Sequence, residues 1–234
     1  MTELLQRPEA TTYDLDDRFR PGAAPMLLTG VQAIARLLVE HRALDRRRGL
    51  RTASFVSGYQ GSPLGGLDRM LADMPEMLAE NDIRFVPGIN EELAATSVWG
   101  SQIELPGGST HDGVTGFWYG KGPGVDRCSD VFKHANMAGT AQHGGVIALA
   151  GDDHISKSST AAHQSDHIFK ACGTPVFFPS SVQEILDMGL HAFAMSRFSG
   201  LWSGMKTIQE VVESSSSVYV DPDRVNIVLP DDFV

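Results

Sequence analysis

Two adjacent glutamates and two glycine-rich turns are the parts of this 234-residue chain whose residue types could carry out chemistry. Glu91 and Glu92 follow a strand-like apolar run and open a helical pattern. Neighbouring side chains on a helix point about 100° apart, so only one of the two carboxylates can point into a cleft at the sheet edge. The alternative is that both carboxylates only favour the positive end of the helix dipole.

The first glycine-rich turn, residues 58–66, reads Gly-Tyr-Gln-Gly-Ser-Pro-Leu-Gly-Gly. It matches neither the phosphate loop, which ends in Gly-Lys-Ser/Thr, nor the Gly-x-Gly-x-x-Gly dinucleotide pattern. It brings backbone groups and the Ser62 hydroxyl to the carboxyl edge of a sheet, but a tight turn without a ligand explains it equally well. The second turn, residues 120–124, is Gly-Lys-Gly-Pro-Gly, where Lys121 could meet a phosphate or carboxylate or belong to a plain turn.

A polar segment rich in serine and histidine follows Gly151-Asp152-Asp153 and extends to Gln164. The acidic pair suggests a metal site or a helix cap. The segment and the residues after it also contain His154, His163, Asp166 and His167. Their spacing and the lack of a fourth firm ligand are not typical of a zinc site. The composition instead favours a mobile active-site loop whose side chains form hydrogen bonds.

The elements that must position these motifs alternate along the chain. Strand-like runs are expected at 53–56, 83–86, 114–119, 146–150, 175–178, 201–207, 218–220 and 225–229. Helical patterns are expected from Thr29 to Gly49 and at 67–81, 91–103, 126–140, 182–198 and 208–213, with Pro75 weakening or kinking the second. This alternation predicts an α/β fold with a mostly parallel, doubly wound sheet and helices on both faces. Such sheets bind ligands at their carboxyl edge.

Composition limits the function. The net charge of −10 argues against a broad nucleic-acid surface, and no apolar run approaches the roughly 20 residues of a membrane helix. The first residues lack the apolar core of a secretion signal, so a cytoplasmic location is expected. Two cysteines, Cys128 and Cys172, cannot hold a four-cysteine iron–sulfur cluster. Residues 1–25 are polar and predict an amino-terminal arm, and residues 26–234 predict one domain.

Together these motifs resemble the amino-terminal part of the long, fused form of indolepyruvate ferredoxin oxidoreductase, a member of the thiamine-diphosphate-dependent 2-oxoacid:ferredoxin oxidoreductases. The matching stretches keep their order and spacing over roughly residues 27–221. They are SGYQGSPLGGLD, Asn90-Glu91 with ATSVWG after it, WYGKGPGVDR, HANMAGT with HGG, LAGDDHISKSSTAAHQS and SRFSGLWSGMKT.

The resemblance implies a domain that binds the pyrimidine end of thiamine diphosphate. By position after the asparagine, Glu91 matches the family's acidic residue, which contacts the aminopyrimidine ring and is catalytic; Glu92 is the alternative. The turn residues Gly61, Ser62 and Pro63 match cofactor-binding positions, and the Ser62 hydroxyl also matches a position near the 2-oxoacid. The family's loop after the strand covers the site, which implies substrate or lid roles for Ser158, Ser159 and Gln164. The glycine-rich motif around Lys121, and not the resemblance, suggests that this residue faces the same cleft.

The implied reaction is the oxidative decarboxylation of a 2-oxoacid such as indolepyruvate, with electrons passing to iron–sulfur clusters and ferredoxin and the acyl group passing to coenzyme A. The sequence lacks the Gly-Asp-Gly pattern with a downstream asparagine that holds the diphosphate through Mg²⁺. It also lacks the cysteines for [4Fe-4S] clusters and a coenzyme A domain.

These absences predict a domain truncated at its carboxyl end that is inactive alone. Its partner would be a diphosphate-binding domain on another chain or in a missing carboxyl-terminal part, within an oligomer. Two alternatives stay open. The chain could be a non-catalytic remnant of such an enzyme, or the pyrimidine-binding domain of another thiamine enzyme such as a decarboxylase.

Overall fold

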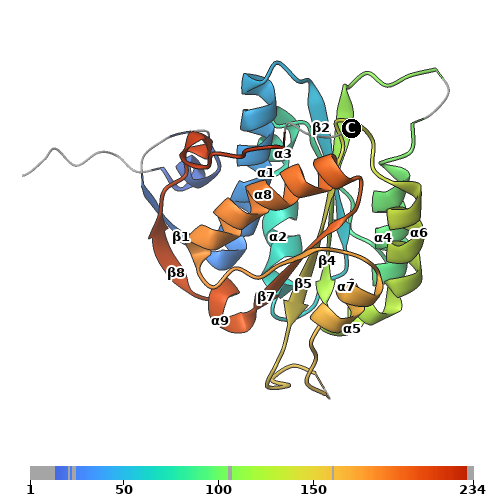
Figure 1. Ribbon diagram of the computed structural model, residues 1–234. Helices are drawn as coiled ribbons and strands as arrows, with labels where there is room; N and C mark the ends of the chain where they lie inside the picture. Colours follow the sequence, from blue (N-terminus) through green and yellow to red (C-terminus); the bar gives the residue numbers. More distant parts are fainter. Residues whose placement is uncertain (1–13, 21, 23–24, 105–106, 160, 231–234) are drawn as a thin grey trace, which may run out of the picture.

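The computed structural model describes residues 14–20, 22, 25–104, 107–159 and 161–230 (Figure 1). Its main element is a parallel six-stranded sheet with the strand order β3-β2-β4-β5-β7-β6. The strands are β2 (Thr52–Gly58), β3 (Ile83–Phe85), β4 (Gly113–Lys121), β5 (Val146–Asp152), β6 (Val176–Phe177) and β7 (Ser203–Ile208). The α/β fold with a parallel, doubly wound sheet is therefore confirmed.

Helices cover both faces of this sheet (Figure 1). One face carries α1 (Gly30–Arg47), α2 (Gly65–Ala72) and α8 (Val182–Ser199), and the other carries α4 (Glu91–Gly100) and α6 (Ser129–Ala138). Short helices complete the connections. They are α3 (Pro75–Glu80), α5 (Gly122–Arg127), α7 (Asp166–Ala171) and α9 (Gln209–Val212).

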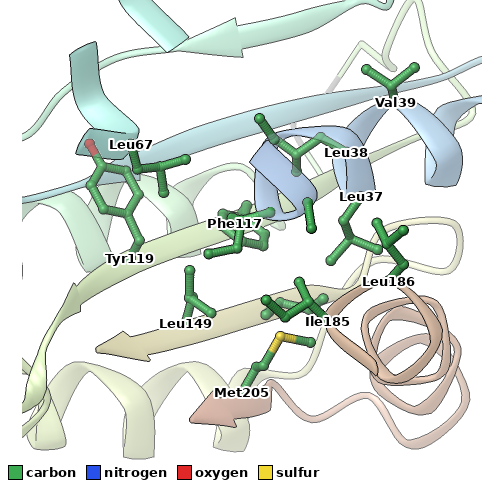
Figure 2. Packing of buried hydrophobic residues seen from close by; sticks show 14 of the residues in the cluster. Leu37, Leu38, Val39, Leu67, Phe117, Tyr119, Leu149, Ile185, Leu186 and Met205 are labelled. Carbon is green, nitrogen blue, oxygen red and sulfur yellow. The ribbon is translucent and has the colours of Figure 1, made fainter. Parts of the chain in front are cut away.

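The two faces have separate hydrophobic cores because successive side chains of a strand point to opposite sides. Phe117 and Tyr119 of β4 enter the core under α1, α2 and α8, whereas Trp118 between them enters the core under α4 and α6. Figure 2 shows the first of these cores, with Phe117, Leu149 and Met205 on the strands and Leu37, Ile185 and Leu186 on the helices. Both faces of the central strands are thus buried, as expected for a parallel sheet.

Helix α1 begins at a capping box, in which the Thr29 side chain accepts a hydrogen bond from Gln32 N and the Gln32 side chain accepts one from Thr29 N. Its polar face is buried as well as its apolar face. Glu40 lies 2.8 Å from the guanidinium of Arg224, and Asp45 lies 2.6 Å from that of Arg197 on α8. The helix is therefore enclosed, and its buried charges are paired, as burial requires.

The structure differs from the sequence prediction in several elements. The predicted helix 67–81 is two helices, α2 and α3, with Pro75 as the first residue of the second. The sequence did not predict α7, nor the strand β1 (Met26–Thr29), which pairs antiparallel with β8 (Ser215–Val218). Residues 225–229 form neither helix nor strand, because Val225 and Ile227 pack against the core instead of pairing.

The predicted arm of residues 1–25 lies largely outside the described residues. Its described part contains a short 3-10 helix, η1 (Leu15–Phe19), and a second such helix, η2 (Pro222–Arg224), lies near the other end of the chain. Phe19 is buried in the core, so this part of the arm packs on the domain. Within the described residues, no helix has both the length and the apolar character needed to cross a membrane.

Candidate functional site

The strand order places a topological switch point between β2 and β4. The chain passes from β2 outward to β3 on one side, then returns to β4 and continues to β5 on the other side. In open α/β sheets the crevice at the carboxyl ends of two such strands is the usual ligand site. Here those ends are Gly58 and Lys121, so both glycine-rich turns begin at the switch point.

The first glycine-rich turn lies across the ends of β4 and β5. Tyr59 N donates a hydrogen bond of 3.1 Å to the carbonyl of Tyr119. A Cβ at Gly61 would lie 2.9 Å from Cδ of Lys121, and one at Gly151 would lie 2.9 Å from Cδ of Pro63. A side chain at Gly151 would displace Pro63 and Leu64, whereas one at Gly61 would meet only the flexible Lys121 side chain. Gly61, Ser62, Pro63 and Lys121 are therefore brought together, as expected, and the Ser62–Pro63 peptide bond is cis.

Glu91 is the first residue of α4, and the Asn90 side chain caps the helix by accepting a hydrogen bond from Leu93 N. Glu91 is only 8% exposed, whereas Glu92 is exposed. Trp118 Nε1 donates a 3.0 Å hydrogen bond to the Glu91 carbonyl. A 2.8 Å bond from Gly88 N to the Gly58 carbonyl ties this turn to the glycine-rich turn. The structure therefore turns Glu91, not Glu92, towards the interior beside the switch point.

The second glycine-rich turn forms the wall against which the Glu91 side chain packs. A Cβ at Gly124 would lie 2.6 Å from Cγ of Glu91. The Arg127 guanidinium lies 3.9 Å from Oε2 of Glu91. Cys128 is fully buried nearby, and burial together with the charges of Glu91 and Glu92 raises the pKa of its thiol. Among the described residues, no hydrogen bond reaches the carboxylate oxygens of Glu91, which therefore remain able to accept one.

Lys121 carries the available positive charge at the switch point. Its ammonium forms no salt bridge with any residue in the described part of the chain. Hydrogen bonds from Ser158 and Lys157 lower the pKa of the Asp153 carboxyl, and the charge of Lys121 contributes to that shift. An anionic group of a ligand could therefore pair with Lys121 without breaking an existing ion pair.

The serine- and histidine-rich segment, described over residues 153–159 and 161–165 and called the 153–165 segment below, is held at both ends by the acidic pair. Asp153 accepts hydrogen bonds from the backbone of Lys157 and from the backbone and hydroxyl of Ser158. Asp152, which is fully buried, accepts bonds from the backbone and hydroxyl of Ser165. The acidic pair therefore organises the segment, a role that the sequence pattern did not distinguish from metal binding or helix capping.

The remaining predicted lid residues lie on this segment, where Gln164 is exposed and the Ser159 hydroxyl is buried. Within the described residues, no hydrogen bond joins Ser158, Ser159 or Gln164 to Ser62 or Glu91. The structure therefore brings Glu91 and the glycine-rich turns to one edge of the sheet. It shows no hydrogen bond between them and the predicted lid residues in the described part of the chain.

His163 is a residue of the site that sequence reasoning considered only as a metal ligand. Its Nε2 donates a 2.8 Å hydrogen bond to Oδ2 of Asp126, and its Nδ1 lies 3.8 Å from Oδ1 of Asp152. The described residues contain no group of three or more histidine, cysteine or acidic side chains that could hold a metal ion. No local sequence signal joins these three residues, because they come from separate elements.

Exposed hydrophobic side chains form part of the border of the site. Two surface pockets of about 450 and 400 Å³ lie elsewhere, one around Arg46 and Met74 and the other around Gln102 and His111. Around the turns of the site, four large hydrophobic side chains are exposed: Tyr59, Val86, Ile89 and Leu93. A site with an apolar exposed border is suited to completion by another domain.

The fold resembles that of part of a solved 2-oxoacid:ferredoxin oxidoreductase. The structure of the 2-oxoglutarate:ferredoxin oxidoreductase from Magnetococcus marinus, with 2-oxoglutarate, coenzyme A and succinyl-CoA bound, superimposes with a TM-score of 0.65. The match covers 87% of this chain and 33% of that chain, at 15% sequence identity.

The sequence is similar to indolepyruvate oxidoreductase subunit IorA of Methanothermobacter marburgensis, with 28% identity over 184 residues, or 78% of this chain. The IorA subunit of Methanothermobacter thermautotrophicus is 26% identical over 186 residues, or 80% of this chain. The chain spans about a quarter of each relative, 26% of its length. No protein-family model matches the chain.

These similarities confirm the predicted resemblance to the 2-oxoacid:ferredoxin oxidoreductases, and to indolepyruvate oxidoreductase among them. The residue roles that the resemblance implies remain predictions.

Proposed function

We propose that this chain supplies the half-site that binds the aminopyrimidine ring of thiamine diphosphate in a 2-oxoacid:ferredoxin oxidoreductase acting on indolepyruvate or another aryl pyruvate. The observation that carries the proposal is the Glu91 carboxylate. It lies mostly buried at a helix start beside the switch point and receives no hydrogen bond from the described residues.

The residues present fit the pyrimidine end of this cofactor. A carboxylate in a mostly buried site can share a proton with a ring nitrogen of the aminopyrimidine. We assign this role to Glu91. Gly124 leaves the space for its side chain, and Trp118 fixes the backbone from which it extends. When bound, thiamine diphosphate would supply the carbon nucleophile for the 2-oxo group, and the protein would position it.

Ser62 and Lys121 are the groups we assign to the 2-oxoacid and its carboxylate. Ser62 follows Gly61 in the turn that packs on the Lys121 side chain, so the hydroxyl and the ammonium belong to one edge of the sheet. Lys121 forms no ion pair within the described chain, which supports its pairing with a substrate anion. Ser158, Ser159 and Gln164 would approach the substrate only if the 153–165 segment moves over the turn.

The other half of the site would come from a diphosphate-binding domain, on another chain or in a further part of the same protein. That domain would hold Mg²⁺, and further domains would carry the [4Fe-4S] clusters, bind coenzyme A and meet ferredoxin. The exposed Tyr59, Val86, Ile89 and Leu93 beside the site support such an interface. The modest share of each relative that this chain spans agrees with a multi-part enzyme.

The test compares Glu91→Gln with Glu92→Gln in the assembled enzyme, by the NMR-measured rate of exchange of the thiamine C2 proton. Loss of a general acid–base group lowers rates by about 10²–10⁴-fold, and we expect an effect of that order for Glu91→Gln. Glu92→Gln is the matched control, since its side chain is exposed one position along the same helix. Equal effects of the two substitutions would refute the assignment of Glu91.

A further inference from the structure

Helix α5 lies between the Glu91 side chain and the 153–165 segment, and on one side it holds His163. A Cβ at Gly122 would lie 2.2 Å from Nδ1 of His163 and 2.9 Å from Oδ1 of Asp152. Asp126, one turn further along the helix, accepts the 2.8 Å hydrogen bond from His163 Nε2. Residues four apart share a helix face, so Gly122 and Asp126 form one seat for the imidazole.

On its other side the same helix holds Glu91. Gly124 packs against the Glu91 side chain, where a Cβ would lie 2.6 Å from Cγ and 3.3 Å from Cδ. Arg127 lies three residues further along, with its guanidinium 3.9 Å from Oε2 of Glu91. Residues three apart also share a face, so Gly124 and Arg127 form a second seat, for the carboxylate.

The His163 seat has no spare room. Asp152 is fully buried at the end of β5, and it already accepts two hydrogen bonds from Ser165 at the end of the segment. Its other oxygen, Oδ1, and Nδ1 of His163 face each other at 3.8 Å, and neither has a hydrogen-bond partner among the described residues. The imidazole therefore packs between β5 and α5 with 15% of its side chain exposed, and movement of the segment would carry it away from both.

We propose that α5 transmits the position of the 153–165 segment to Glu91, and that His163 is a positioning residue for the Glu91 carboxylate. A helix of six residues with close contacts on both sides moves as a unit. When His163 is seated, α5 presents Gly124 and Arg127 to Glu91 at the observed positions. When the segment moves away, α5 loses its contact with His163. The Glu91 carboxylate then loses the positions of Gly124 and Arg127 against which it packs.

The consequence for catalysis rests on the proposed function of Glu91. Displacement of the segment from its observed position would then change the placement of the Glu91 carboxylate at the same time.

The test follows two NMR signals of the 234-residue chain without any cofactor. They are the side-chain carboxyl carbon of Glu91, assigned by its loss in Glu91→Gln, and the indole N–H of Trp118, which bonds to the Glu91 carbonyl. His163→Ala removes the contact with Asp126 and is expected to shift both signals as far as Arg127→Gln does. His163→Gln retains a hydrogen-bond donor for Asp126. Both signals in this variant are expected to lie closer to their wild-type positions than in His163→Ala.

His154→Ala is the matched control. This histidine is exposed on the same segment, 4.0 Å from Oδ2 of Asp152, and forms no hydrogen bond with α5 in the described structure. The control is expected to leave both signals at their wild-type positions. If His163→Ala does not fold, Asp126→Ala removes the same contact from the α5 side.

Unchanged Glu91 and Trp118 signals in His163→Ala and Asp126→Ala would overturn the proposal, and so would an equal shift in His154→Ala. The result is independent of the proposed function, because no cofactor is present. The NMR signals could shift while Glu91→Gln and Glu92→Gln have equal effects on C2 proton exchange. That result would support the coupling of His163 to Glu91 through α5 and refute the catalytic role of Glu91.

Discussion

Glu91 and Glu92 are adjacent residues of the same type, but the structure gives them different surroundings. The Asn90 cap starts α4 at Glu91, and this start turns the first carboxylate inward and the second into solvent. Gly124, from a distant part of the chain, leaves the volume that the inward side chain occupies. The difference between the two glutamates therefore arises from tertiary packing, which an acidic pair alone does not encode.

His41 makes the stability of the protein depend on pH. Burial lowers the pKa of this α1 imidazole to about 3, against an ordinary value near 6.5 in the unfolded chain. Below pH 6.5 the unfolded chain binds the proton more readily than the folded one, so stability is lost as the pH falls from about 6.5 towards 3. At pH 4.5 the expected loss in the free energy of unfolding is on the order of 2–3 kcal/mol.

Urea unfolding at pH 7 and pH 4.5 checks this prediction in the wild type and in His41→Phe. The phenyl ring keeps the stacking on Phe193, whose ring centroid lies 4.1 Å from that of His41, but does not titrate. Asp45 is common to both proteins. Burial opposes its ionisation, but the hydrogen bonds of Arg197 outweigh this effect and lower its pKa, so its contribution is lost at more acidic pH. The same pH dependence in both proteins would contradict the role of His41.

Much of the site could be predicted residue by residue because parallel strands end at a common edge. Ser62, Glu91 and Lys121 each follow a strand-like run, and the structure places all three at the carboxyl edge. The His163 contacts could not be predicted in this way. They depend on how α5 begins and how the acidic pair fastens the 153–165 segment, and no local periodicity encodes either feature.

At the scale of elements, the contact of α1 with α8 supports the whole first core. Gly189 of α8 faces Leu37 of α1, where a Cβ would lie 2.2 Å from Cδ2 of the leucine. Figure 2 shows Leu37 beside Leu186 in this contact. We expect Gly189→Ala to lower the free energy of unfolding by about 1–3 kcal/mol, because the added methyl group overpacks the crossing.

Denaturant unfolding of Gly189→Ala is compared with that of Gly100→Ala. Gly100 is the last residue of α4, and a Cβ there would meet nothing within 4 Å. Alanine is the better helix former by up to about 1 kcal/mol, so the control is expected to be neutral or slightly stabilising. Equal stability of Gly189→Ala and the wild type would contradict the prediction, because it would show that α1 and α8 can move apart without a loss in the free energy of unfolding.

The alternation of strands and helices was the part of the fold that the sequence predicted well. The run at 146–150 becomes β5, buried on both faces, and the predicted helix 182–198 becomes α8. The burial of the polar face of α1 could not be predicted. Its partners Arg197 and Arg224 lie far along the chain, and a local periodicity reports only one apolar stripe. The polar face of α1 is buried because of long-range ion pairs and not because of helix propensity.

At the scale of the whole molecule, the described residues form one α/β unit with a site that is open on one side. The switch point, the Glu91 seat and the exposed hydrophobic side chains lie along the edge at which we propose that a second domain completes a cofactor site. The likeness to enzymes several times longer than this chain agrees with that arrangement. The central claim is therefore that this unit provides half of a shared thiamine diphosphate site.

A calorimetric titration with thiamine diphosphate and Mg²⁺ tests that claim most directly. It is carried out on this chain alone, on a diphosphate-binding partner domain alone, and on their mixture, each with wild-type and Glu91→Gln chain. We predict tight binding only in the mixture, weakened by Glu91→Gln. Equally tight binding by the chain alone, or a mixture that binds no better than the partner domain does, would contradict the account.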